Sequence, residues 1–213
     1  MFVQQNQATQ LARLFSLLAQ GERLAHHSAT QQSRMMLNQE RPSQAKFLKT
    51  QAKQELFHAR VFDGTITWLD SNQACTPYRC LEKYSGHLET SLKQGAMTES
   101  ILATQVVLES LGKLALQGID NRMNRYSFGL KKIRSTILAQ EDQHHDFGQS
   151  ELHRFMQEEN MDLTAVQNLA YQYLELAFEV LDEVEPLFES LDSNSHRFKQ
   201  DLIGEMPSWL NLS

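Results

Sequence analysis

The chain contains two pairs of side chains in which a glutamate precedes a histidine by three residues. Glu55 and His58 form the first pair, and Glu141 and His144 form the second. Residues three apart on an α-helix lie on one face, close enough to bind the same ion. Carboxylate oxygens and imidazole nitrogens together are typical ligands of iron, manganese and zinc. The two pairs therefore predict metal chemistry.

Two further glutamates are each isolated in an apolar stretch. Glu22 is the only acidic residue among the first 39, and it lies between Leu18 and Ala25 on an apolar stripe. Glu109 is likewise the only acid in the apolar middle of its segment. A buried carboxylate costs several kcal/mol unless it is paired or bound to a metal. We therefore expect both glutamates to complete the ligand set.

The distances along the chain place these side chains at one level. In the sequence, 33 residues separate Glu22 from Glu55, and 32 separate Glu109 from Glu141. Two residues of an antiparallel helical hairpin are level when the turn lies midway between them. The midpoints fall beside a break at 38–42 and within a polar turn at 121–127. We therefore predict six metal ligands meeting deep inside one bundle: Glu22, Glu55, His58, Glu109, Glu141 and His144.

The elements that would position these ligands are all helices. The chain has only four prolines and is rich in Leu, Gln, Ala and Glu, which favour helices. Asp162 is a plausible N-cap for a late helix. We predict an all-α fold with a ferritin-like four-helix bundle, one long crossover and additional C-terminal helices, over these ranges: helices at 5–35, 43–70, 97–122, 127–158 and 162–191, a shorter helix at 80–92 within the connector 71–95, and one more in the tail 192–213.

Composition narrows the class of protein. A chain of 213 residues with 41% hydrophobic residues can form one domain, which we expect to comprise the bundle at 5–158 and an extension at 159–213. The net charge of −6 gives no general attraction for nucleic acid. No apolar run approaches the roughly 20 residues of a membrane span. Because the N-terminus also lacks the pattern of a secretory signal, we expect a cytoplasmic protein without a stable membrane anchor.

Several other side chains have less specific patterns. His26 and His27 are expected to be surface or supporting residues. His145 forms a shifted pair with Asp142, which fits the inner stripe less well than Glu141 and His144 do. Asp146 has two interpretations, an acceptor for an imidazole N–H or an exposed acid. Cys75 and Cys80 are expected to be plain thiols, with a local disulfide as the alternative.

Residues beside the ligands are candidates for a pocket. Gln51 and Gln105 each lie one turn before a ligand and are expected to line it. Small residues near the ligands either leave a channel or allow close helix packing: Ala25, Ala52, Ala59 and Gly112. The helix at 162–191 has one apolar and one acidic face, so it either covers the bundle or forms a dimer contact.

The six predicted ligands resemble those of the ferritin-like di-iron carboxylate superfamily over residues 5–158. Within it, the local motifs resemble those of demethoxyubiquinone hydroxylases in three places: Gly21-Glu22, Gln54-Glu-Leu-Phe-His58 and Glu141-Asp-Gln-His-His-Asp-Phe-Gly148. The resemblance implies two iron ions, or a manganese and iron pair. It also implies dioxygen, an organic substrate and an electron donor protein as partners.

These expectations define a non-haem di-iron oxidoreductase that activates dioxygen, a hydroxylase or monooxygenase of a small or apolar organic substrate. A first alternative is a ferritin- or rubrerythrin-like protein that oxidises iron or scavenges peroxide. A second is a helical adaptor without catalytic activity. A homodimer is compatible with each of them.

Overall fold

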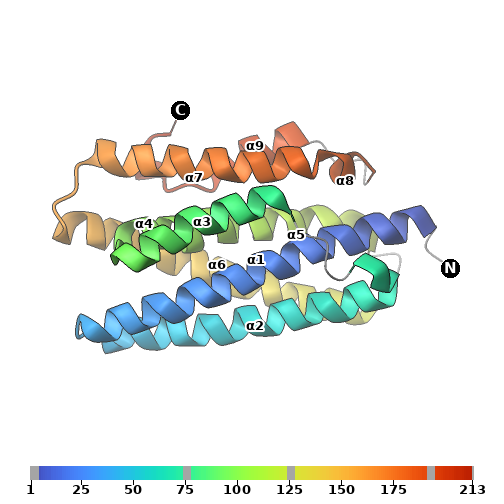
Figure 1. Cartoon of the computed structure of the whole chain (residues 1–213), viewed down its shortest axis with the longest axis horizontal. Coiled ribbons are helices and arrows are strands. Elements are labelled where there is room, and N and C mark those ends of the chain that lie inside the picture. Colours follow the sequence, from blue (N-terminus) through green and yellow to red (C-terminus); the bar gives the residue numbers. More distant parts are fainter. Residues whose placement is uncertain (1–4, 74–77, 124–127, 191–194, 213) are drawn as a thin grey trace.

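A computed structural model of the chain describes residues 5–73, 78–123, 128–190 and 195–212. Within these ranges the chain is all-α and contains no strand, which confirms the predicted fold class. The long helices lie side by side in a bundle, with the C-terminal helices on one side (Figure 1). None of the described helices has the length and apolar character needed to cross a membrane.

The first hairpin consists of α1 (Gln5–Asn38) and α2 (Pro42–Asp70). The break between them lies where the sequence predicted it. Glu40 has a φ of 58°, and the N–H of Arg41 donates to the carbonyl of Met36 at 2.9 Å. Pro42 then begins α2 with its fixed φ, which suits the first turn of a helix. This tight turn makes the two helices antiparallel neighbours (Figure 1).

The connector between the two hairpins contains α3 (Arg79–Gln94). Gly95 ends this helix with a φ of 72°, a conformation that favours glycine. The short helix predicted inside the connector is therefore present. Cys80 has a free, buried thiol, whereas Cys75 lies outside the described residues.

The third long helix is not regular, contrary to the prediction for 97–122. It begins as α4 (Met97–Ile101), continues as the π-helical segment η2 (Leu102–Leu108) and ends as α5 (Glu109–Met123). Another helix packs closely on this segment, because Gly148 lies directly against Gln105. Wide π turns are often found at functional sites.

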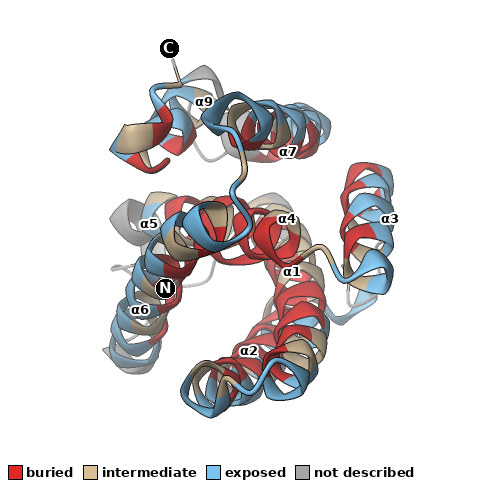
Figure 2. Cartoon of the chain, turned by 90° about the vertical axis from the view of Figure 1, so that its left-hand side faces the viewer, coloured by how far each residue is buried: buried red, intermediate tan, exposed pale blue. Residues whose placement is uncertain are grey.

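The fourth bundle helix, α6 (Phe128–Glu158), returns along the third. Residues 121–123 of the predicted polar turn are the last residues of α5, and the rest of that turn lies outside the described residues. Asp162 occupies the N-cap position of the next helix, but its side chain makes no capping hydrogen bond. Figure 2 shows buried residues on the faces of α1, α2 and α4 that point into the bundle.

The C-terminal region contains α7 (Leu163–Glu183), α8 (Glu185–Ser190), α9 (Ser195–Gly204) and the 3-10 turn η3 (Ser208–Leu210). The prediction of one helix over 162–191 was wrong, because the chain leaves helical geometry at Val184. Pro186 explains this end, since proline clashes with the preceding helical turn and donates no hydrogen bond. Leu191 lies outside the described residues.

Helix α7 covers the bundle with its apolar face, which was the first of the two alternatives for this helix. Its buried face packs on η2 and on α3. The Glu183 carboxylate accepts hydrogen bonds from the backbone N–H groups of Arg79 and Cys80, at 3.3 and 2.9 Å. Lys83 of α3 pairs with Glu179 at 2.5 Å. Helix α7 thus holds α3 in place. The division into a bundle at 5–158 and an extension at 159–213 stays a prediction.

Candidate metal centre

The six predicted ligands lie together in the middle of the bundle, and every one of them is at most 7% exposed. They come from four helices, with two each from α2 and α6 and one each from α1 and α5. Their ligand atoms form two groups, each with all atoms within 4.8 Å of one another: Glu22, Glu55, His58 and Glu141 in the first group, and Glu55, Glu109, Glu141 and His144 in the second.

Glu55 and Glu141 belong to both groups and therefore lie between the two half-sites. Glu55 Oε2 is 3.1 Å from His58 Nδ1, and Glu55 Oε1 is 2.9 Å from His144 Nδ1. Ligand atoms about 2.1 Å from an octahedral divalent cation lie about 3 Å from one another. Each oxygen of Glu55 therefore faces a different histidine, and the two oxygens could bind different ions in a site that holds two.

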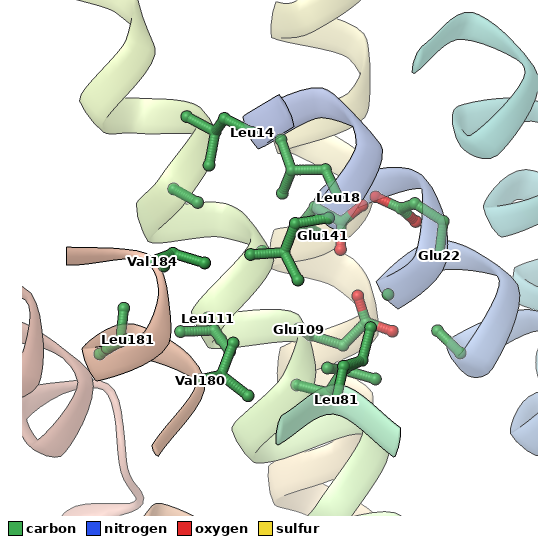
Figure 3. A pocket seen from close by; sticks show the side chains of 16 residues that line it. Leu14, Leu18, Glu22, Leu81, Glu109, Leu111, Glu141, Val180, Leu181 and Val184 are labelled. Atoms are coloured by element: carbon green, nitrogen blue, oxygen red, sulfur yellow. The ribbon is translucent and has the colours of Figure 1, made fainter. Parts of the chain in front are cut away.

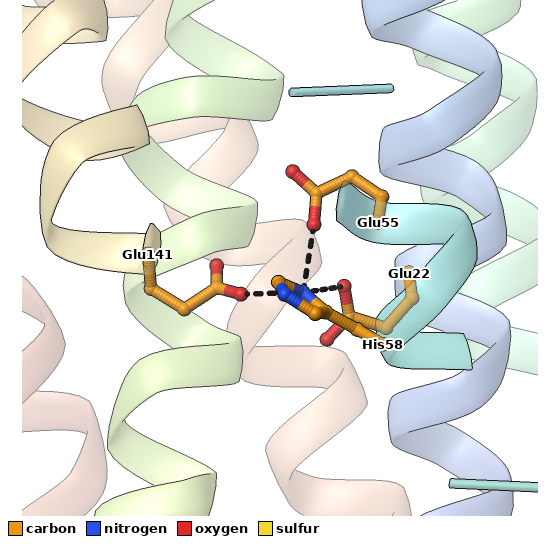
Figure 4. A group of neighbouring side chains, drawn as sticks. All are labelled: Glu22, Glu55, His58 and Glu141. Atoms are coloured by element: carbon orange, nitrogen blue, oxygen red, sulfur yellow. Dashed lines mark hydrogen bonds and ion pairs between the residues drawn. The ribbon is translucent and has the colours of Figure 1, made fainter. Parts of the chain in front are cut away.

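Figure 4 shows the half-site around His58, with Glu22, Glu55 and Glu141 directed at the imidazole. Its Nδ1 atom is 3.1 Å from Glu141 Oε1 and 3.3 Å from Glu22 Oε2. Three carboxylates therefore converge on one imidazole nitrogen. In the other half-site, His144 Nδ1 is 3.8 Å from Glu109 Oε2, a looser arrangement.

The second nitrogen of each imidazole is bound by a glutamine. His58 Nε2 donates to Gln140 Oε1 at 2.7 Å, and His144 Nε2 donates to Gln54 Oε1 at 2.9 Å. An amide oxygen only accepts hydrogen bonds, so this pattern assigns a proton to each Nε2. The Nδ1 atoms, which face the carboxylates, are left as the metal-binding atoms.

The acid and base groups of the cluster strongly change one another's protonation. Burial and neighbouring carboxylates raise the pKa of Glu141 well above its usual value, and burial does the same for Glu22. Burial opposes ionisation of Glu55, but its contacts with the two histidines outweigh this and lower the pKa. Burial also opposes charge on His144, yet contacts with carboxylates raise its pKa to about 10. Without a cation the cluster therefore holds several protons.

The cluster meets the requirements of a dinuclear site. Both carboxylate oxygens of Glu55, Oε1 of Glu141 and Nδ1 of His144 are buried without a hydrogen-bond partner. Such atoms normally carry a penalty of about 1–3 kcal/mol each. Two divalent cations would serve as their partners and would balance four carboxylates. The residues present therefore fit a pair of divalent metal ions.

Gln51 and Gln105 do not line the apolar pocket beside the cluster, contrary to the expectation. They form a buried chain of amides instead. Gln51 Nε2 donates to Glu109 Oε1 at 2.6 Å, and Gln105 Nε2 donates to Gln51 Oε1 at 3.3 Å. Gln32 continues this chain with two hydrogen bonds to Gln105, at 2.7 and 3.1 Å. The chain fixes the Glu109 carboxylate and the π-helical segment together.

An apolar pocket of about 50 Å³ adjoins three of the carboxylates, Glu22, Glu109 and Glu141 (Figure 3). Its other walls come from α1, α5 and α7, together with Leu81 of α3, Leu108 of η2 and Val184 just after α7. Two of the four small residues expected to leave a channel do line it, and two do not: Ala25 and Gly112 line the pocket, whereas Ala52 and Ala59 are buried elsewhere. Space beside the carboxylates is therefore lined almost entirely by hydrocarbon.

The other histidines lie outside the two groups of ligand atoms. His26 Nδ1 contacts the carbonyl of Ala52 at 2.6 Å, and His27 is exposed. His145 is buried beside the Gln149 amide at 3.3 Å, and burial lowers its pKa. Asp146 is exposed, as one of its two interpretations expected.

Sequence reasoning assigned no role to Gln54 and Gln140, although a signal was present. Each motif begins with glutamine, so the repeated unit is Gln-Glu-x-x-His. One wall of the pocket was also not predicted: it consists of Val180 and Leu181 of α7 and of Val184 just after this helix. Periodicity shows that α7 has an apolar face, but it does not show what the face covers.

No protein-family model matches the sequence, and no curated protein matches it significantly. The fold and the site therefore define the protein as an all-α bundle with a buried cluster of four glutamates and two histidines.

Proposed function

We propose that this protein is a non-haem di-iron oxidoreductase of the ferritin-like type, which uses dioxygen to hydroxylate a small or apolar organic substrate. One observation carries the proposal. Two groups of buried ligand atoms share Glu55 and Glu141, and an apolar pocket touches their carboxylates. The resemblance of the two Glu-x-x-His motifs to di-iron proteins gives the same class.

In this proposal, each predicted ligand belongs to one half-site or to both. Glu22 and His58 would hold one ion, Glu109 and His144 the other, and Glu55 and Glu141 lie between them. When bound, two iron ions supply the electrons and the Lewis acidity for reducing dioxygen. Hydroxylation consumes one dioxygen, two protons and two external electrons, and releases the hydroxylated product and water. The two electrons must come from an external reductant, for which we propose an electron donor protein.

The pocket supports an apolar substrate group. Leu18 of α1, Leu111 of α5 and Val184 just after α7 line the space beside the carboxylates with hydrocarbon. The volume of about 50 Å³ is far below the roughly 300–1,000 Å³ of pockets that enclose a whole organic ligand. A small molecule, or only the reacting end of a longer one, fits this space.

A larger groove gives a route for a longer substrate. A groove of about 560 Å³ lies between α1 and α3, with polar residues such as Gln20, Arg23 and Glu82 in its walls. Leu81 lines both this groove and the inner pocket. A molecule in the groove would therefore reach the carboxylates when the Leu81 side chain turns aside.

The small inner pocket also favours a second function, the oxidation of iron itself or the reduction of peroxide. A cavity of about 50 Å³ has room for dioxygen or peroxide. Such a protein would process many ferrous ions or peroxide molecules per chain without an organic substrate.

Anaerobic titration with ferrous iron, followed by exposure to oxygen, tests the proposal. We expect two irons per chain and a charge-transfer band after oxygen is added. Glu55→Ala and Glu141→Ala should each weaken both half-sites, because these carboxylates are shared. Asp146→Asn is the matched control, an exposed acid on the same helix as Glu141.

Three outcomes separate the alternatives. Continued oxidation of iron far beyond two per chain would favour the iron-oxidising function. Oxidation that stops at two irons and is coupled to product formation from apolar compounds supports the hydroxylase. No binding by the parent protein, or binding by both alanine variants equal to that of the parent, would refute the metal centre and leave the adaptor.

A further inference from the structure

We propose that Gln54 and Gln140 form a reciprocal brace, in which the glutamine of each Gln-Glu-x-x-His motif positions the metal-binding histidine of the other motif. The inference rests on the proposed metal centre and assigns to these glutamines a role in building it. They are positioning residues, because they contact the histidines and not the predicted ions.

The brace crosses between the two hairpins. Gln54 lies on α2 and accepts from His144 of α6 at 2.9 Å. Gln140 lies on α6 and accepts from His58 of α2 at 2.7 Å. Both imidazoles are at most 1% exposed, so water does not compete at their Nε2 atoms. Each hydrogen bond therefore links a predicted ligand of one hairpin to a glutamine side chain of the other.

The chemistry of the amide explains why glutamine suits this position. An imidazole held at Nε2 cannot turn its ring over without losing the hydrogen bond, so Nδ1 stays directed at the carboxylates. A carboxylate at the same position would add negative charge beside four glutamates. The neutral amide orients the ring and leaves a balance of four carboxylates against two divalent ions.

The reciprocal arrangement predicts which half-site each glutamine controls. His58 belongs only to the group with Glu22, and His144 belongs only to the group with Glu109. Loss of Gln140 should therefore weaken the half-site of Glu22, and loss of Gln54 should weaken the half-site of Glu109. The glutamines thus act on separate ions, whereas Glu55 acts on both.

Two measurements on the full chain test this assignment. The first is titration with cobalt(II), which binds such ligands and is followed by absorbance. The parent should bind two ions, and Gln140→Leu or Gln54→Leu should each keep one ion at parental affinity and bind the other about 10- to 100-fold more weakly. Gln140→Glu and Gln54→Glu change the charge but keep an acceptor for the imidazole N–H, so each should bind the affected ion more tightly than the corresponding leucine variant does. Gln143→Leu, an exposed glutamine on α6, is the control.

The second measurement is the nuclear magnetic resonance of imidazole protons without any metal. The parent should show two slowly exchanging Nε2–H signals, from His58 and His144. Gln140→Leu should lose only the His58 signal, and Gln54→Leu only the His144 signal. Gln140→Asn and Gln54→Asn, which shorten the side chain by one methylene, replace a leucine variant that does not fold.

The outcomes are distinguishable from a failure of the proposed function. If the parent binds no cobalt and no iron, the metal centre is wrong, but the proton signals still decide whether the glutamines orient the histidines. The brace is overturned if the His58 signal survives in Gln140→Leu, or if one leucine variant weakens both ions equally. It is also overturned if both leucine variants bind cobalt as the parent does.

Discussion

The close contact between α6 and the π-helical segment makes a sharp prediction for Gly148→Ala. A Cβ atom at Gly148 would lie 2.4 Å from Gln105 Cβ and 3.0 Å from the Gln105 carbonyl carbon. Carbon atoms in contact are normally about 3.5–4.0 Å apart. Since part of the obstacle is backbone, it cannot turn aside, and the two helices must separate by about 1 Å.

The magnitude follows from two opposing effects. Inserting a methyl group into a packed core costs about 1–3 kcal/mol. Replacing glycine by alanine within a helix returns about 0.5–1 kcal/mol. Because the contact at Gly148 is far shorter than a normal one, we expect a net loss of about 2 kcal/mol in the free energy of unfolding. For a chain of this length, that loss lowers Tm by roughly 4–8 °C.

The matched control is Gly64→Ala on α2. Gly64 is exposed, and a Cβ atom there would meet nothing within 4 Å. The same substitution should therefore raise stability by about 0.5–1 kcal/mol, with a small increase in Tm. Thermal unfolding followed by circular dichroism measures both variants. Equal shifts in the same direction would refute the close approach of Gly148 to Gln105.

Two further predictions concern the cluster and its pocket. When a chelator has removed the metal, burial opposes charge on His144, but its carboxylate partners raise its pKa to about 10. The stabilisation that protonated His144 gives the folded chain is complete below about pH 6.5 and is lost as pH rises to 10. Burial raises the pKa of Glu22, so ionisation of this carboxyl also lowers the stability of the folded chain as pH rises above 4.5. The Tm of the chelated protein should therefore fall between pH 6.5 and 10. A rising Tm would contradict these shifts. Leu81→Ala should join the inner pocket to the outer groove and increase binding of an apolar fluorescent probe, measured by titration. The control is Leu88→Ala, which changes a buried leucine of α3 that lines neither space and should not increase binding of the probe. Equal binding by both variants would contradict the role of Leu81.

The hairpins and the convergence of the six side chains could be predicted because they depend on helix geometry alone. Spacings of 33 and 32 residues about two turns place glutamates at one level, and an interval of three residues places Glu and His on one face. The end of α7 could also have been predicted from Pro186, since proline breaks a helix, but the sequence prediction overlooked it.

Other features could not be predicted because they depend on contacts between distant helices. The segment Leu102–Leu108 has the composition of an ordinary α-helix, and its π form accompanies the approach of Gly148 from α6. The repeated glutamine before each Glu-x-x-His was visible, but its partner across the bundle was not. Gln51 and Gln105 were placed near the ligands correctly, yet their hydrogen bonds to each other and to Glu109 need the structure.

The predicted metal ligands and one wall of the pocket come from different parts of the chain. The predicted metal ligands all precede residue 145, whereas Val180, Leu181 and Val184 stand opposite the carboxylates (Figure 3). Mutations at these three positions can therefore change the shape of the pocket without altering any predicted ligand. Under the proposed function, selection could then alter the choice of substrate in one segment while the metal ligands of another are kept.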